Sequence, residues 1–186
     1  SEAIVQRICE FANRRGVLAE FDEITSHLVA EASANQFEQA LADVAGFLGF
    51  IGERPEQTDP KGPDVLWLLN DAYGLVIEAK SRKKADNALT REEHGQLLHA
   101  AEWFRSTYPK LKCVRVSVHP NATVTRSTVA SDTKALTFDN LKRLVADTRA
   151  LLEELCRSQL EATQLVVRCE KQLAKTRLIP SSLADE

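Results

Sequence analysis

The sequence contains no methionine, and it has only seven glycines and six prolines in 186 residues. Disordered and fibrous chains are rich in glycine and proline, so these low numbers favour a globular fold with much helix. Because methionine is missing even from position 1, we expect a fragment of a longer protein. No run of 18 apolar residues occurs, which argues against a membrane-spanning helix and against a membrane partner.

Cysteine pairs and an excess of basic charge are also missing. The four cysteines are Cys9, Cys113, Cys156 and Cys169. None forms a Cys-x-x-Cys pair, and no His/Cys cluster has zinc-ligand spacing, so we expect neither a structural zinc site nor a disulfide framework. A reducing compartment, the cytoplasm, is the simplest expectation. The net charge is -3, so any contact with nucleic acid requires a local basic patch.

The hydrophobic pattern predicts several helices and a small group of strands. Helical spacing of apolar residues predicts helices at 2–14, 17–32, 35–48 and 90–105, and again from 137 onward. Short apolar or alternating runs predict strands at 64–69, 75–80 and 112–119. Polar stretches predict loops at 53–63 and 121–134. Since no glycine or proline occurs between Pro120 and Pro180, the last helical region could be very long.

Three Asp/Glu-x-Lys triplets occur, and only one of them ends an apolar strand. The triplet is expected about once or twice by chance in a chain of this size, so its context decides. Asp59–Lys61 contains a proline in a loop, and Asp132–Lys134 lies in a Ser/Thr-rich loop. Alternation along the strand places Glu78 and Lys80 on the same face. Such charges are costly beside a strand core unless they pair or bind something.

Asp64 opens the preceding predicted strand, and thirteen residues separate it from Glu78. Pairing of the two strands as a hairpin would bring Asp64 beside Glu78 and Lys80. Two adjacent carboxylates repel each other, and a hard divalent cation such as Mg²⁺ relieves the repulsion. Mg²⁺ would polarise a phosphodiester oxygen and help to generate hydroxide, while Lys80 orients the water or stabilises negative charge. The alternative is a surface salt bridge at a strand end.

Gly62-Pro63-Asp64 followed by Glu78-Ala79-Lys80 resembles the PD-(D/E)xK motif of restriction-endonuclease-like nucleases. The order of elements over about 34–155 is similar too: a helix bearing Glu, strands bearing Asp and Glu-x-Lys, and a helix bearing Gln. Glu38 and Gln96 occupy the first and last of these positions. The resemblance implies an α/β, three-layer restriction-endonuclease-like fold with a mixed central sheet and extra helices at both ends.

The same resemblance implies Mg²⁺-dependent hydrolysis of phosphodiester bonds in DNA, with Mn²⁺ as a substitute. Asp64, Glu78 and the carbonyl of Ala79 would bind the metal, and Lys80 would position or activate water. The family's other two positions imply that Glu38 binds a second metal or a water. They imply that Gln96 contacts water or the scissile phosphate.

Basic residues follow the motif directly, at Arg82, Lys83 and Lys84. They are equally consistent with a solvated loop and with contacts to DNA phosphates. Domains that resemble this one are often joined to helicase or recognition modules, so we expect such a partner domain in the full-length protein.

We expect a nuclease-like core over 34–155, between a helical extension at 1–33 and a C-terminal helical extension and tail at 156–186. The N-terminal extension could serve as a cap, a linker or a homodimer contact. Residues 138–155 should pack on the core. Residues 160–175 should extend away and dock on the N-terminal helices or on another subunit.

Two other functional hypotheses remain open. One is a non-catalytic DNA-binding or scaffold module that keeps the nuclease fold. The other is an unrelated small-molecule enzyme, but the sequence has no glycine-rich phosphate loop and no Ser or Cys nucleophile motif. A cleavage assay with Mg²⁺ or Mn²⁺ separates the nuclease from the scaffold.

Overall fold

The computed structural model of the chain describes residues 1–80, 88–120 and 132–185. It is an α/β fold with a five-stranded mixed sheet. The strands are β1 (Ile51–Glu53), β2 (Val65–Leu68), β3 (Tyr73–Ala79), β4 (Lys112–Val118) and β5 (Thr133–Leu136). The helices are α1 (Glu2–Cys9), α2 (Arg15–Thr25), α3 (Ala34–Phe47), η1 (Pro55–Gln57), α4 (Arg91–Thr107), α5 (Phe138–Arg157), α6 (Ala162–Leu173) and α7 (Pro180–Asp185).

The sheet keeps the sequence order of its strands, from β1 at one edge to β5 at the other. β1, β2 and β3 are antiparallel neighbours, whereas β3, β4 and β5 run parallel. The parallel step from β3 to β4 passes through α4, which is the crossover that parallel strands require.

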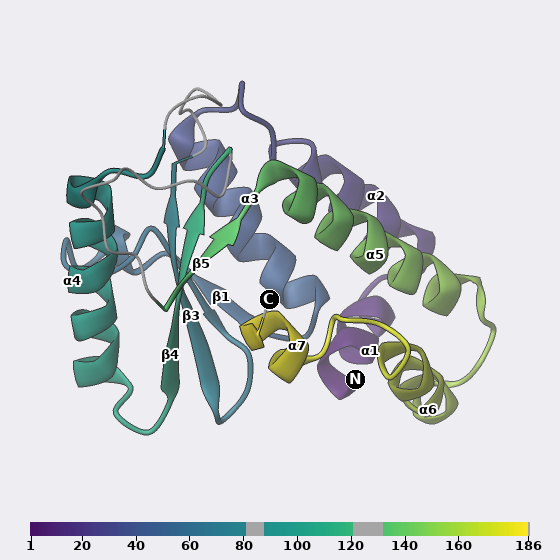
Figure 1. Cartoon of the computed structure of the whole chain (residues 1–186). Helices are drawn as coiled ribbons and strands as arrows, with labels where there is room; N and C mark the ends of the chain where they lie inside the picture. The colour runs from purple at the N-terminus through teal and green to yellow at the C-terminus, as the bar shows by residue number, and fades with distance from the viewer. Residues whose placement is uncertain (81–87, 121–131, 186) are drawn as a thin grey trace.

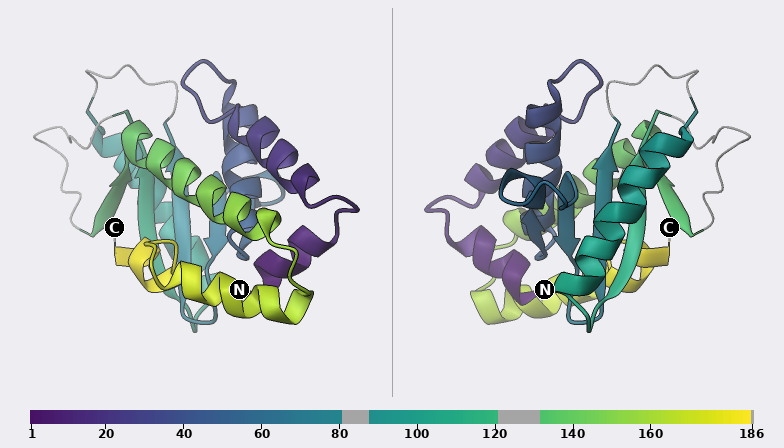
Figure 2. Two further views of the ribbon diagram at one scale, coloured as in Figure 1. Left: turned by 90° about the vertical axis from the view of Figure 1, so that its right-hand side faces the viewer. Right: turned by 90° about the vertical axis from the view of Figure 1, so that its left-hand side faces the viewer.

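Helices cover both faces of the sheet, as Figures 1 and 2 show. Leu66 and Val76 pack with Leu97 and Phe104 of α4 on one face. The alternate residues of the same strands, Trp67 among them, belong to the larger core on the opposite face, to which α3 and α5 contribute. This alternation gives the hairpin strands two buried faces, so their sequence is almost continuously apolar.

The β2–β3 hairpin fixes the register of the candidate site. Val65 lies opposite Ile77, so Asp64 comes one residue before β2, at the level of Glu78 in β3. In the parallel pairing with β4, the neighbour of Glu78 is Ser117. The predicted strands at 64–69, 75–80 and 112–119 are confirmed, with ends that differ by a residue or two.

Helix α3 begins at a capping box and ends at a glycine that the turn requires. Ser33 accepts a hydrogen bond from the backbone of Gln36, whose side chain returns to the Ser33 backbone. Gly49, just after the helix, has φ +73°, a left-handed conformation that glycine adopts without strain. A second glycine, Gly52, lets β1 approach α3 closely, since a Cβ there would lie 1.9 Å from the Ala42 carbonyl oxygen.

The two ends of the chain pack on the core and on each other. α6 lies against α1, and α5 lies against α2, where Arg149 pairs with Asp22 at 2.8 Å. The segment 160–175 docks on the N-terminal helices, as predicted, but it does not extend away, because Leu165 and Cys169 of α6 are part of the main core. Buried residues of α1, α2 and α6 belong to the same hydrophobic core as α3 and the sheet.

Several predicted boundaries were wrong. The first predicted helix, 2–14, already ends at Cys9, and the last helical region, which could have been one long helix, is divided where the chain leaves α5 at Ser158 and begins α6 at Ala162. β1 and β5 were not predicted as strands, and α2 begins at Arg15 rather than at residue 17, so it includes Gly16. Strands of three and four residues at the edges of a sheet are too short to show the alternation of apolar and polar residues by which a strand is recognised in a sequence. In the part of the chain that the structure describes, no helix is long and apolar enough to cross a membrane.

Candidate functional site

Asp64 lies where β2 begins, beside the end of β3. Its Oδ2 accepts a hydrogen bond from the backbone N–H of Ala79 at 2.7 Å. The side chain of Glu78, only 9% exposed, lies on the same end of the hairpin. The pKa of Glu78 is raised to about 7, mainly by burial and secondly by the negative charge of Asp64. The hairpin thus brings two carboxylates together at one end of the sheet, where each disfavours ionisation of the other.

Lys80 supplies part of the missing positive charge and links β3 to α4. Its Nζ lies 3.5 Å from Glu78 Oε2 and donates a hydrogen bond to Gln96 Oε1 at 2.9 Å. A capping box of Thr90 and Glu93 sets the start of α4, which was predicted to begin at this position. Gln96 is exposed, one and a half turns into that helix, so its visible contact is with Lys80 rather than with the core.

Glu38 comes to the site from α3 and is bound by a buried arginine. Arg54 follows β1 directly, and its Nη2 pairs with Glu38 Oε2. The two side chains are only 7% and 9% exposed. Burial is the main reason that the pKa of Glu38 is raised to about 7, followed by the charges of Asp64 and Glu56. Arg54 lowers it, but not enough to restore an ordinary value.

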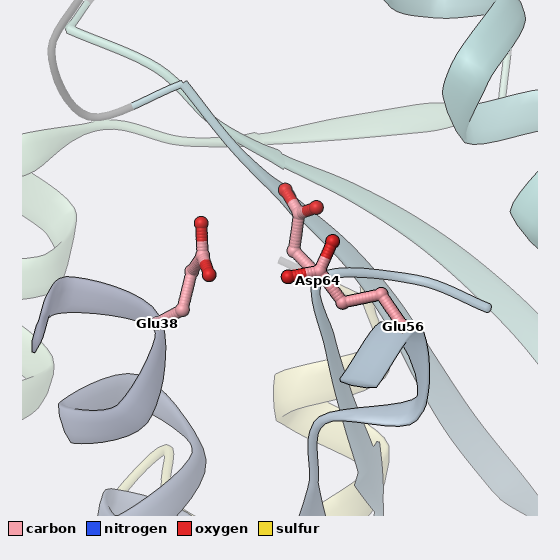
Figure 3. A group of neighbouring side chains, drawn as sticks. All are labelled: Glu38, Glu56 and Asp64. Atoms are coloured by element: carbon pink, nitrogen blue, oxygen red, sulfur yellow. The ribbon is translucent and has the colours of Figure 1, made fainter. Parts of the chain in front are cut away.

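Glu56 completes a group of three carboxylates. One oxygen each from Glu38, Glu56 and Asp64 lies within 4.8 Å of the other two. Figure 3 shows the three side chains converging from α3, from η1 and from the start of β2. Burial and the neighbouring Asp64 raise the pKa of Glu56 as well. Asp64 therefore belongs to two carboxylate neighbourhoods, one with Glu78 and one with Glu38 and Glu56.

The structure brings together Asp64, Glu78 and Lys80 at one end of the hairpin, with Gln96 and Glu38 around them. Their roles in metal binding and catalysis stay predictions. Ala79, predicted as a ligand through its carbonyl, contacts Asp64 through its backbone N–H. Arg82, Lys83 and Lys84 lie outside the described residues.

Sequence reasoning missed Arg54 and Glu56, which it placed in a polar loop. That loop folds back on itself, because the N–H of Glu56 donates to the Pro63 carbonyl at 3.3 Å. The fold-back places Glu56 next to Asp64, eight residues away in sequence. The sequence offers one signal for this fold-back, Pro55 between Arg54 and Glu56, since a proline can start a tight turn.

A polar floor under α4 was missed as well. Ser117, the register neighbour of Glu78, and His94 of α4 are both more than nine-tenths buried. Among the described residues, Ser117 Oγ and His94 Nδ1 have no hydrogen-bond partner. Buried polar atoms are normally satisfied, so this end of the sheet is polar beyond the carboxylates themselves.

Comparisons with family models, with curated proteins and with solved structures gave no match to this chain. What the site can do follows from its own chemistry. Three carboxylates, those of Glu38, Glu56 and Glu78, surround Asp64, and Arg54 and Lys80 are the described cations in contact with this group. Carboxylate oxygens at this spacing are suited to a hard divalent cation.

Proposed function

We propose that this protein is a divalent-metal-dependent nuclease that hydrolyses phosphodiester bonds in DNA. The observation that supports this most is the convergence of Glu38, Glu56 and Asp64, with oxygens within 4.8 Å of one another, beside Glu78 and Lys80. A carboxylate cluster of this kind with an adjacent lysine suits phosphoryl chemistry, in which positioning and charge stabilisation do most of the work.

The side chains fit a metal ion on electrostatic grounds. Burial is the main cause that raises the pKa values of Glu38 and Glu78 to about 7, and the negative charge of Asp64 adds to it, so a bound cation would favour the ionised carboxylates. Asp64 would be the central ligand, with Glu56 and either Glu38 or Glu78 beside it. Mg²⁺, with Mn²⁺ as a substitute, would supply a Lewis acid that offsets the charge of a phosphodiester.

Lys80 is the residue that would act on the reacting phosphate or on the attacking water. Its Nζ is held between Glu78 and Gln96, so its position is set from both β3 and α4. Only 21% of this side chain is exposed, which reduces screening of its charge by solvent. Gln96 would orient Lys80 and contact water or the phosphate from the exposed side of α4.

The finer assignment of fold is part of the same proposal. A Glu-bearing helix, a hairpin bearing Asp and Glu-x-Lys, and a Gln-bearing helix follow one another as in restriction-endonuclease-like nucleases. DNA is the substrate that this resemblance favours. With a net charge of -3, the domain would find DNA through a local basic patch or through a helicase or recognition domain.

Metal binding and cleavage of one set of variants test the proposal. Asp64→Asn removes the central charge and keeps the side-chain shape and its acceptor for the Ala79 N–H. It should weaken Mn²⁺ binding in calorimetry and abolish cleavage of a mixed panel of single- and double-stranded DNA. Glu53→Gln, an exposed carboxylate on the nearby strand β1, is the matched control and should change neither.

Two results would overturn the proposal. The first is Mn²⁺ binding that is equally strong in wild type and Asp64→Asn, since the ion would then bind elsewhere. The second is a wild type that shows no metal-dependent cleavage on any DNA or RNA tried. In that case a non-catalytic module that keeps the fold becomes the better hypothesis.

A further inference from the structure

The segment 54–63, which carries one of the clustered carboxylates, is bound to helices on both faces of the sheet. At its start, Arg54 pairs with Glu38 of α3. Further along, the carboxylate of Asp59 accepts a hydrogen bond at 2.8 Å from the indole N–H of Trp103, a residue of α4. Since α3 and α4 lie on opposite faces of the sheet (Figure 1), the segment connects the two helical layers beside the candidate site.

Backbone hydrogen bonds make this segment compact. The N–H groups of Thr58 and Asp59 both donate to the Pro55 carbonyl, at 3.0 and 2.9 Å, and the N–H of Gly62 donates to the Asp59 carbonyl at 2.8 Å. The two ends of the segment also touch, because a Cβ on Gly62 would lie 2.6 Å from the Cβ of Pro55. A displacement of Asp59 would therefore reach Pro55 and, next to it in the chain, Glu56.

The hydrogen bond between Asp59 and Trp103 joins a charged acceptor to a fixed donor. The pKa of the Asp59 carboxyl lies below its usual value, because the backbone N–H of Lys61 and, after it, the indole N–H of Trp103 donate to it. Hydrogen bonds to a charged acceptor are stronger than those to a neutral one. The ring of Trp103 packs against the hydrophobic cluster under α4 and meets the ring of Tyr108 edge to face, with centroids 6.4 Å apart.

Trp103 lies on the same stripe of α4 as Gln96. Seven residues, or about two helical turns, separate the two, so their side chains project from one side of the helix. Gln96 accepts a hydrogen bond from Lys80, and Trp103 donates one to Asp59. Helix α4 therefore contacts both parts of the chain that reach the site on this side, the end of β3 and the segment 54–63.

We propose that Trp103 is a positioning residue for metal binding, which acts through Asp59 to keep Glu56 beside Asp64. This inference rests on the proposed function and adds a role for a residue that touches neither metal nor substrate. Two neighbouring carboxylates repel each other before a cation is bound, so Glu56 needs support from outside the cluster. Groups that orient metal ligands from outside typically contribute about 10- to 100-fold to metal affinity.

Calorimetric titration with Mn²⁺ tests this role. Trp103→Phe removes the indole N–H and keeps an aromatic ring in the cluster under α4, and it should weaken Mn²⁺ binding about tenfold. Tyr108→Phe is the matched control, since it removes a polar group from the neighbouring ring and leaves the bond between Trp103 and Asp59 in place. The control should bind Mn²⁺ as wild type does.

A double-mutant cycle with Glu56→Gln separates positioning from a general loss of structure. If Trp103 acts through Glu56, the effect of Trp103→Phe on Mn²⁺ affinity should disappear in the Glu56→Gln background, where the charge of this ligand is already gone. A defect that is merely structural would weaken Mn²⁺ binding by the same factor in both backgrounds. That result would overturn the proposal.

Amide hydrogen exchange without metal tests the support itself. Peptides that cover 54–63 should exchange faster in Trp103→Phe than in wild type or in Tyr108→Phe. An unchanged exchange rate in this segment would overturn the proposal. Wild type that binds Mn²⁺ no more tightly than Trp103→Phe would overturn the positioning role alone, whereas wild type that binds no Mn²⁺ would overturn the proposed metal site and this role with it.

Discussion

The guanidinium of Arg54 pairs with the carboxylate of Glu38, joining the turn after β1 to the second turn of α3. The same Nη2 lies 3.4 Å from Glu56 Oε1, and Nη1 donates to Asn35 Oδ1 at 2.7 Å. Arg54 is therefore the main described counter-charge for two of the three clustered carboxylates. Its loss should affect stability, and a bound cation should compensate for it.

We predict that Arg54→Ala destabilises the metal-free protein by about 3–5 kcal/mol at pH 8, the usual cost of leaving one member of a buried ion pair alone. The loss should be smaller at pH 5, where Glu38 is protonated. Urea unfolding in the presence of a chelator measures it. Arg149→Ala is the control, because its pair with Asp22 is 42% and 47% exposed and should contribute little to stability. Equal losses in the two variants would contradict this account.

The raised pKa values predict how stability depends on pH without metal. Glu38 and Glu78 have pKa values of about 7 in the folded state and an ordinary value of 4.5. Between these values the folded state binds more protons than the unfolded state, so their contribution to stability is full below 4.5 and is lost as pH rises through 7. At about 1.4 kcal/mol per pKa unit, the expected loss is a few kcal/mol.

Chelator-treated protein should therefore unfold more easily at pH 8 than at pH 5. The difference should be smaller in Glu78→Gln, which has no proton to lose. His94 acts in the opposite direction, because burial lowers its pKa, so the comparison between wild type and variant is the informative one. A wild type and Glu78→Gln with parallel pH profiles would show that Glu78 has an ordinary pKa. Saturating Mg²⁺ should also flatten the wild-type profile if it binds the carboxylates.

Gly52 tests how closely α3 and β1 approach each other, and Gly95 of α4 serves as the control. A Cβ on Gly52 would lie 1.9 Å from the Ala42 carbonyl oxygen, so Gly52→Ala must push β1 away from α3. We expect a loss of more than about 3 kcal/mol, as for other severe overpacking. Gly95, inside α4, has no atom within 4 Å of its Cβ position, and Gly95→Ala should stabilise by about 0.5–1 kcal/mol. Denaturant unfolding measures both effects. The packing of β1 against α3 would be contradicted if the unfolding midpoints of the two variants moved in the same direction.

The part of the site that could be predicted from sequence depends on local geometry. Asp64, Glu78 and Lys80 lie on adjacent strands of one hairpin, where strand parity and hairpin pairing determine which side chains meet. The capping box at Thr90 and the cationic end of β3 are local in the same sense. Such features need no knowledge of distant residues.

The remaining part of the site and the break after α5 depend on contacts between residues far apart in the sequence, which leave no periodic pattern in it. Glu56 reaches Asp64 because an eleven-residue loop, 53–63, folds back, and Arg54 is buried because α3 covers it. The break after α5 contains neither glycine nor proline. Arg14, far away in sequence, binds the carbonyls of Ser158 and Leu160 there and replaces the helical hydrogen bonds. These contacts form only when the chain is already folded.

The most direct test of the central claim is single-turnover DNA cleavage with Mg²⁺ by Lys80→Ala. This variant removes the charge that would act on the reacting phosphate and leaves the four carboxylates in place. Losing one such contact typically costs about 3–4 kcal/mol in the transition state, so the rate should fall roughly 10²- to 10³-fold. Filter binding should show a much smaller change in DNA affinity, because many phosphate contacts share it. Lys110 is an exposed lysine just beyond the far end of α4, and Lys110→Ala should cleave like wild type. A Lys80→Ala protein that also cleaves at the wild-type rate would contradict the assignment of this site as a nuclease centre.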